Sequence, residues 1–405
     1  MKSIYDILEF NKILTKLSDF ADSNAAKDFC LNLKKVSDVK LLNKYLDETD
    51  AAYSCLKSGV QPSFNNLYDL TGIVSRLEKS AALNITELLH ISYCLDLAAK
   101  IIAYRNTKEF NSCLDVYFNT LNDLKYENDA IKRVIISENE ISDNASSVLQ
   151  AIRRKKILLR EKIHTTANRL LNSYSDYLQE PVLANKDGAI CLPVKSEFKN
   201  KVDGTVHSVS SSQFTIFIEP KEIISLNNEM AENEALEEIE INKILFELSK
   251  SFIPHIEVLK NNYKSLVHLD FAFAKAKYAL SLNATLPVLN TNGIINLIDA
   301  RHPLIDKDKI VPLNITLGER FTSLIITGPN TGGKTVSLKT VGIIELMALS
   351  GLFIPAKENS KIAIFDNIFA DIGDEQSIEQ SLSTFSSHMT NIVHILKNVT
   401  KNSLV

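Results

Sequence analysis

The chain has 405 residues, of which 45% are hydrophobic and 23% charged, so it is long enough to bury two or three cores. Its formal net charge of −4 argues against a generally basic nucleic-acid coat. No signal-like N-terminus or apolar run of membrane-spanning length is evident, and five scattered cysteines without a Cys-x-x-Cys pair favour a cytoplasmic protein without membrane contact.

Apolar residues recur at helical spacing over the first third of the chain, from Ile4 to about Ile136. Two further periodic stretches follow, at about 141–180 and 226–282, and they predict long helical arms that pack antiparallel. Pro254 lies within the second stretch and should kink or divide it. Between the arms, residues 181–225 contain short alternating runs separated by turn residues, which predict a small β-rich tip.

From about Pro287 the pattern becomes α/β. Strand candidates are 294–298, 324–327 and 362–365. A helix is expected to begin near Thr384, with its inner face formed by Phe385, Met389, Ile392, Val393 and Leu396. The predicted fold is therefore α+β and multidomain. Its expected parts are a helical core or lever (1–140), the arms (141–180 and 226–282), a β clamp tip (181–225) and an α/β domain (283–405).

Residues Gly328 to Thr335 read Gly-Pro-Asn-Thr-Gly-Gly-Lys-Thr, which is a complete phosphate-binding loop (P-loop) between a strand-like run and a helical pattern. Glycines allow backbone N–H groups to turn toward phosphate oxygens, and the following helix adds its positive dipole end. Lys334 would neutralise the β- and γ-phosphates, and the Thr335 hydroxyl would bind Mg²⁺, which makes both candidate catalytic residues. The alternative, a glycine-rich turn that matches by chance, is disfavoured by the flanks. The predicted nucleotide-binding residues are Gly328, Pro329, Asn330, Thr331, Gly332, Gly333, Lys334 and Thr335.

The P-loop with its flanks, together with Arg301-His302-Pro303 and the stretch Phe365 to Gly373, resembles the MutS family of ABC-type ATPases. The stretch Asp374 to Met389, the tip sequence Val206 to Pro220 and the start Leu8 to Leu14 resemble its second-type bacterial branch, which lacks the mismatch-reading domains. This resemblance covers almost the whole chain.

The resemblance implies ATP and Mg²⁺ as ligands and a homodimer of the full-length form, in which two ATPase domains cover each other's nucleotide. Ser383, at an expected helix start, matches a position that would contact the γ-phosphate bound by a partner chain; the alternative is a helix cap. Gln376 matches a metal-sensing loop, and its alternative is an exposed polar residue without a function. Asn330 would orient phosphate or the attacking water.

Family members continue beyond the position of Val405 with the Walker B carboxylates, a nucleotide-contacting histidine, dimerisation helices and a terminal nuclease domain. We therefore expect an incomplete ABC-type ATPase half, truncated before Walker B, with weak nucleotide binding and negligible hydrolysis. A fragment and a natural truncation remain alternatives.

Nucleic acid is the expected partner of the β tip, through phosphate contacts that require positive charge alone. A second basic run lies on the first arm between Arg153 and Lys162; it is either another such surface or a solvated helix face, and glutamates of the second arm would repel phosphate or pair with it. The candidate nucleic-acid residues of the tip are Lys186, Lys195, Lys199, Lys201 and Lys221.

The favoured function is an ATP-switched nucleic-acid clamp. The resemblance implies branched DNA and suppression of recombination, or ribosomal RNA and rescue of stalled ribosomes, as roles of full-length relatives. Two other functions remain open from the sequence: a P-loop kinase that phosphorylates a small molecule, and a non-catalytic scaffold fragment.

Overall fold

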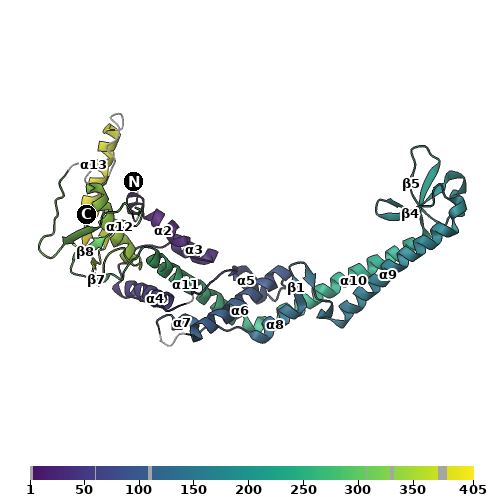
Figure 1. Ribbon diagram of the computed structural model, residues 1–405, viewed down its shortest axis with the longest axis horizontal. Coiled ribbons are helices and arrows are strands. Elements are labelled where there is room, and N and C mark those ends of the chain that lie inside the picture. Colours follow the sequence, from purple (N-terminus) through teal and green to yellow (C-terminus); the bar gives the residue numbers. More distant parts are fainter. Residues whose placement is uncertain (1–2, 60, 108–111, 307, 329–332, 373–380) are drawn as a thin grey trace. The chain divides into compact units, whose positions relative to one another are not determined.

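The computed structural model describes residues 3–405 except 60, 307 and the stretches 108–111, 329–332 and 373–380; the side chains of 381–387 also lie outside the description (Figure 1). The chain forms two compact units. The first comprises 1–71, 93–123 and 257–405, and the second comprises 72–92 and 124–256. The chain is thus α+β, as predicted, and the four finer domain ranges expected from the sequence stay a prediction.

The first unit begins with four helices, α1 (Ile4–Ile7), α2 (Phe10–Ser18), α3 (Asn24–Leu31) and α4 (Val39–Lys57). The side chains of Ser3, Ser23 and Asp38 accept hydrogen bonds at the starts of α1, α3 and α4. Later helices are α7 (Asp115–Phe118), α12 (Lys334–Leu349) and α13 (Ser381–Asn398). The chain passes between the units within α5 (Thr71–Glu78), α6 (Ile85–Asn106) and α11 (Ile256–Ser281), and also between Asp123 and Leu124.

A four-stranded sheet in the first unit has the order β7-β10-β8-β9. Strand β10 (Lys361–Ala363) pairs parallel with β7 (Val288–Asn290) and antiparallel with β8 (Ile295–Ala300), which pairs antiparallel with β9 (Leu313–Leu317). Ile343 and Met347 of α12 share a buried core with Leu297 of β8 and Ile362 of β10. The sheet therefore supports the helix that follows the P-loop, and the strands predicted at 294–298 and 362–365 correspond to β8 and β10.

The strand predicted at 324–327 is absent from the structure, where these residues have no strand assignment. Ile325 is 86% exposed, and Leu324 is also exposed. An apolar, β-branched run becomes a strand when a neighbouring backbone pairs with it. Residues 324–327 take no part in the two-stranded sheet that follows later in the described chain. That sheet joins β11 (Asn367–Ile368) in parallel to β12 (Ser403–Leu404).

The predicted inner face of α13 is also wrong. Met389, Ile392, Val393 and Leu396 are exposed, Leu396 by 70%, whereas Ile395 is buried. The helical period was read correctly, but the helix rests on a different face. The position of Phe385 lies outside the described side chains.

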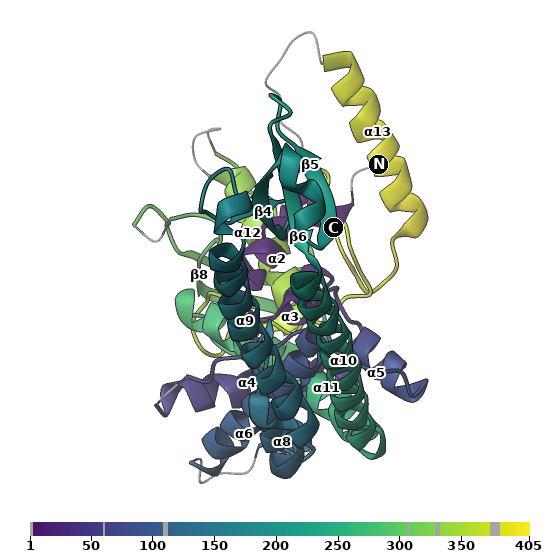
Figure 2. The same ribbon diagram turned by 90° about the vertical axis from the view of Figure 1, so that its right-hand side faces the viewer.

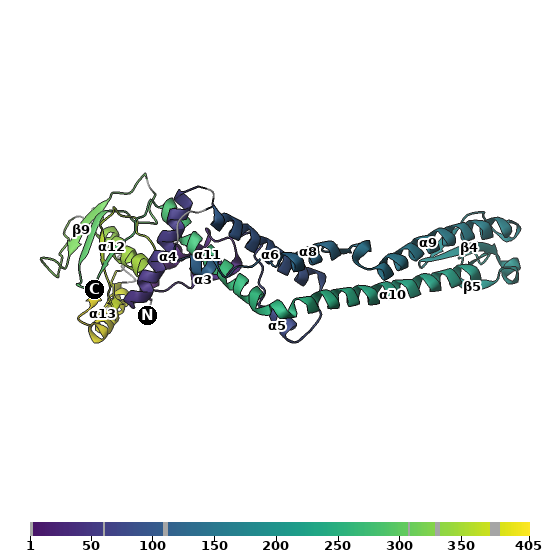
Figure 3. The same ribbon diagram turned by 90° about the horizontal axis from the view of Figure 1, so that it is seen from below.

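The second unit contains α8 (Lys125–Val134), a small antiparallel pair of β1 (Ile135–Ser137) and β2 (Glu140–Ile141), and two long helices. These are α9 (Ser147–Ser173) and α10 (Lys221–Ser251), which lie side by side and run antiparallel (Figures 1 and 3). Leu159 and Ile163 of α9 pack with Leu226 of α10. Pro254 lies in the short 3-10 helix η4 (Ile253–His255), which separates α10 from α11 as predicted. Further 3-10 turns are η1 (Asp143–Ala145), η2 (Ser175–Tyr177) and η3 (Ser196–Lys201).

The predicted β tip is a four-stranded antiparallel sheet between α9 and α10 in the sequence, with the order β3-β4-β6-β5 (Figure 2). Its core joins Leu192 and Ile218 of the sheet to Leu170 of α9 and Ile223 of α10, which fixes the sheet to the helix ends. The strand bounds are β3 (Ala184–Lys186), β4 (Ala189–Lys195), β5 (Gly204–Val209) and β6 (Thr215–Pro220).

Candidate nucleotide and nucleic-acid sites

The two ends of the P-loop are described by the structure. Gly328 has φ of +150° and Gly333 has φ of +78°, which are backbone conformations that favour glycine over any other residue. Gly333 is the N-cap of α12. The predicted residues Pro329, Asn330, Thr331 and Gly332 lie outside the described residues.

Lys334 and Thr335 are the first two residues of α12, so their backbone N–H groups belong to the helix end that has no intrahelical acceptors. The backbone N–H of Ser337 donates to the Gly333 carbonyl at 2.8 Å, and the Ser337 hydroxyl donates to the same carbonyl at 3.0 Å. Lys334 is half-buried and Thr335 is exposed. This end of α12 therefore offers backbone donors, a lysine and a hydroxyl to an anion.

Glu345 lies in the same helix, three turns from the P-loop, and is fully buried. Neither carboxyl oxygen has a hydrogen bond of good geometry among the described residues, although the Ala363 N–H lies near enough to affect the carboxyl pKa. Burial raises the pKa of Glu345 far above its usual range, and this outweighs the lowering effect of the Ala363 N–H. The P-loop helix thus carries into the core a carboxylic acid that burial holds in its neutral form.

The region that carries Gln376 lies outside the described residues, and Ser383 is placed by its backbone in the first turn of α13. Next to this region the structure shows a cluster that the sequence did not predict. Asp371 accepts hydrogen bonds from Asn391 Nδ2 and His388 Nδ1, both at 2.9 Å. These contacts hold the segment after β11 against α13.

The five predicted nucleic-acid lysines of the tip have unequal surroundings. Lys186 lies over the Phe217 ring at 4.3 Å, and the Lys195 ammonium donates to the Asp176 carbonyl at 3.3 Å. Lys221 is exposed and lies 3.9 Å from Asp203. Lys199 and Lys201, in η3, are exposed and have no charged or hydrogen-bonding side-chain partner in the described part of the chain.

Part of the basic run of α9 is neutralised by α10. Glu237 accepts hydrogen bonds from Arg153 Nε at 2.7 Å and from Lys156 Nζ at 2.6 Å, and Lys155 lies 2.9 Å from Glu229. Both basic neighbours lower the pKa of Glu237, against the raising effect of its burial. Of the two alternatives for the glutamates, pairing with the basic run is thus what the structure shows.

A cavity beside α12 was not predicted from the sequence. Its charged and hydrogen-bonding lining includes Glu9, Lys12, Lys16, His302 and Lys339. These residues come from three separate stretches of the chain, so no local motif joins them. The spacing of Lys12 and Lys16, one turn apart on α2, was the one local signal of a shared basic face.

Across the described residues, histidine, cysteine, aspartate and glutamate side chains form no group of three that would bind a metal ion. No helix in the described part of the chain is long and apolar enough to cross a membrane.

Comparison with known proteins gives a consistent family. The family model described as MutS domain V matches residues 324–405. The chain is 48% identical over 406 residues to the endonuclease MutS2 of Lachnospira eligens, an alignment that covers 100% of this chain and 51% of that protein. It is 46% identical over 402 residues to the endonuclease MutS2 of Clostridium perfringens, covering 98% of this chain and 51% of the relative.

A third relative, the endonuclease MutS2 of Agathobacter rectalis, is 45% identical over 408 residues, which cover 100% of this chain and 52% of that protein. The chain thus spans about half the length of the relatives it matches.

Proposed function

Because this chain belongs to the MutS family, in the branch of the endonuclease MutS2 proteins, we propose that it binds ATP with Mg²⁺ and grips nucleic acid through its β tip. The observation that carries the nucleotide part is Gly333. It stands in a left-handed backbone conformation at the N-cap of a helix that begins with Lys334 and Thr335, and the helix is packed on a sheet. A glycine-containing loop that leads into a helix N-terminus is the arrangement on which P-loop proteins bind phosphates.

In this proposal the backbone N–H groups at both ends of the loop surround the phosphate oxygens, and Lys334 neutralises their charge. Thr335 contributes its hydroxyl to Mg²⁺, which neutralises further phosphate charge when bound. The N-terminal part of α13, with Ser383, would approach the nucleotide of a second copy in a homodimer. If the paired copies adopt two arrangements that differ in affinity for the nucleotide, the nucleotide would shift the pair toward the arrangement that binds it more tightly.

The nucleic-acid part of the proposal rests on the tip. Lys199, Lys201 and Lys221 are exposed, and their charge suits the phosphate backbone of DNA or RNA. Such contacts fix position and carry no sequence information. We therefore propose recognition of nucleic-acid shape, as branched DNA or as ribosomal RNA, in the cytoplasm. Arg153, Lys155 and Lys156 contribute less, because glutamates of α10 already neutralise them.

The nucleotide part is tested by titrating the protein with a fluorescent ATP analogue in the presence of Mg²⁺. Binding is expected in the wild type and should fall at least tenfold in Lys334→Ala, since a charge-assisted contact is worth about 1.5–3 kcal/mol. Lys40→Ala, which removes an exposed lysine of α4, is the matched control. Equal affinity in the wild type and Lys334→Ala would refute the nucleotide site. ATP consumption that depends on a small acceptor molecule would instead identify a kinase.

A further inference from the structure

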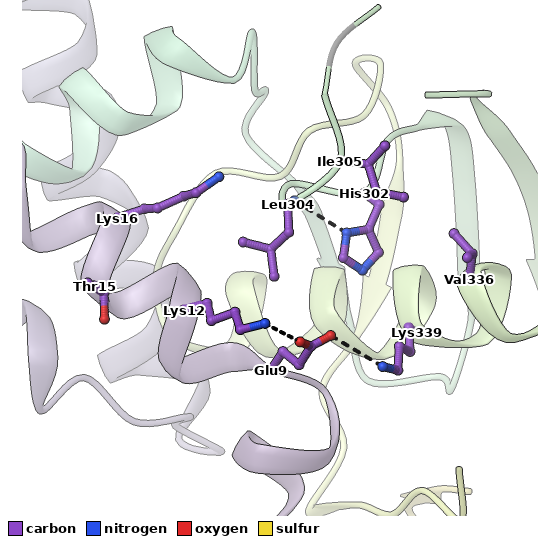
Figure 4. A pocket seen from close by; sticks show the side chains of 9 residues that line it. All are labelled: Glu9, Lys12, Thr15, Lys16, His302, Leu304, Ile305, Val336 and Lys339. Atoms are coloured by element: carbon purple, nitrogen blue, oxygen red, sulfur yellow. Dashed lines mark hydrogen bonds and ion pairs between the residues drawn. The ribbon is translucent and has the colours of Figure 1, made fainter. Parts of the chain in front are cut away.

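A cavity of about 610 Å³ lies beside the first turns of α12. Three segments of the first unit form it, as Figure 4 shows: α2 with the residue before it, the loop after β8, and α12 itself. The lining residues are Glu9, Lys12, Thr15, Lys16, His302, Leu304, Ile305, Val336 and Lys339.

The charged side chains of the cavity are predominantly positive. Three lysines face one glutamate, Glu9, which pairs with Lys12 and, at 3.2 Å, with Lys339. Lys16 has no ion-pair partner among the residues that the structure describes. An ammonium group has three donors, so Lys12 and Lys339 retain hydrogen-bonding capacity beyond their contact with Glu9. The lining therefore carries an excess of two positive charges, three minus one, and unused donors.

His302 gives independent evidence for a ligand. Its side chain is 7% exposed, and its Nδ1 accepts a hydrogen bond from the Leu304 N–H at 3.3 Å. Burial lowers the pKa of His302, so the ring is neutral and carries its proton on Nε2. Figure 4 shows this second nitrogen facing the cavity on the side of Glu9 and Lys339. No hydrogen bond among the described residues uses this nitrogen, so it is available to donate to a ligand in the cavity.

We propose that this cavity binds the phosphate group of a small anionic ligand, at a site separate from the P-loop. The lysines neutralise the phosphate and the His302 Nε2–H donates to one of its oxygens. Leu304, Ile305 and Val336 line the remaining wall, so they contact an apolar or aromatic part of the same ligand. Lys339 follows Lys334 by five residues, about 7.5 Å along the helix axis, and Gly333, Lys334 and Thr335 do not line the cavity.

The test uses pyrophosphate as the probe and isothermal titration calorimetry as the measurement. Lys16→Ala and Lys339→Ala should each weaken pyrophosphate binding about tenfold. The control Lys34→Ala, which removes an exposed lysine outside the cavity, should leave this binding at wild-type strength. Glu9→Gln removes the competing carboxylate and should strengthen binding at least threefold. Circular dichroism checks that each variant is folded.

Wild-type pyrophosphate affinity in both Lys16→Ala and Lys339→Ala would overturn the proposal, because the probe would then bind elsewhere, for example at the P-loop. A gain in Glu9→Gln cannot arise from misfolding, so no gain also counts against the cavity. Failure of the P-loop proposal is seen separately, with the ATP analogue.

Discussion

Leu8 packs directly onto Gly342, in the middle of α12: a Cβ atom built on Gly342 would lie 2.8 Å from Leu8 Cδ1 and 3.0 Å from Leu8 Cδ2. Glycine inside a helix costs about 1 kcal/mol relative to alanine. Here it allows the fully buried Leu8 to reach the P-loop helix. The N-terminal segment and the helix of the nucleotide site therefore share one core.

Leu8→Ala is expected to lower the free energy of unfolding by about 2–5 kcal/mol, because it leaves a cavity against α12. Gly342→Ala should destabilise the wild type through overpacking but stabilise the Leu8→Ala variant, where the methyl group has room and helix propensity improves. Urea unfolding of the four proteins in a double-mutant cycle measures this coupling. Additive effects would show that Leu8 and Gly342 do not press on each other.

Because of the buried carboxyl group of Glu345, we expect the free energy of unfolding to fall as the pH rises. Its pKa is raised in the folded state, so above the unfolded value of about 4.5 the unfolded chain ionises and gains free energy over the folded one. The loss amounts to at most about 1.4 kcal/mol per pH unit. Glu345→Gln should therefore match the wild type most closely at pH 4 and exceed it increasingly toward pH 8.

Thermal and urea unfolding between pH 4 and 8 check the prediction for Glu345. Glu358→Gln, at an exposed glutamate, should leave the pH profile unchanged. If the profiles of the wild type and Glu345→Gln run parallel, the carboxyl group is not neutral in the folded protein.

For the buried Lys275 we expect the opposite effect, a free energy of unfolding that rises with pH. Its side chain is 1% exposed, its ammonium donates to the Tyr45 carbonyl at 3.1 Å, and burial lowers its pKa from 10.5 to about 8, although the charge of Glu48 opposes this. Below pH 8 both states carry the charge, and the folded state bears the cost of its burial. Between pH 8 and 10.5 the folded lysine is neutral while the unfolded one still binds a proton, so stability rises.

Lys275→Met should consequently be more stable than the wild type at pH 7, and its advantage should shrink by about 3 kcal/mol between pH 8 and 10.5. The measurement is the difference in unfolding free energy across this pH range. A constant difference would mean that Lys275 keeps its ordinary pKa in the folded protein.

Local signals in the sequence located much of the fold. The 3.6-residue period of α2, with Phe10, Ile13, Leu14 and Leu17 buried, and the break at Pro254 depend on neighbouring residues alone. The run Leu324 to Thr327 has strand propensity too, but strand formation needs a partner from elsewhere in the chain. Because no partner strand in the described part of the chain pairs with this run, it is exposed and forms no strand. The strand predicted at 324–327 was wrong for that reason.

The candidate sites likewise differ in whether neighbouring residues in the sequence are enough to predict them. The P-loop is one contiguous motif, so the sequence alone predicts a site at Gly333, Lys334 and Thr335, and α12 begins at Lys334 as the motif requires. The cavity joins Lys16 to His302 and Lys339, which are far apart in the sequence and meet through the packing of α2 on α12. No periodicity within one segment predicts such a meeting.

The tip gives the last prediction. If the tip contacts phosphates, replacing both Lys199 and Lys201 by alanine should weaken binding to branched, linear and single-stranded DNA by similar factors. The salt slope is the slope of log K against log salt concentration. For duplex DNA each lost phosphate contact reduces its magnitude by about 0.9, so the slope of the double variant should be smaller by nearly 2. Fluorescence anisotropy between 50 and 200 mM salt, roughly the range in which such effects are large, measures both quantities.

Two matched lysines distinguish this contact from a loss of net charge. Lys250→Ala removes an exposed charge of α10, and Lys155→Ala removes one that Glu229 neutralises at 2.9 Å. Both should leave the salt slope almost unchanged, because neither lysine offers a free charge on the tip to a phosphate. A slope that falls equally in all variants would show that DNA responds to the overall field of the protein. A slope that stays constant in the Lys199 and Lys201 variant would remove the tip from the interface.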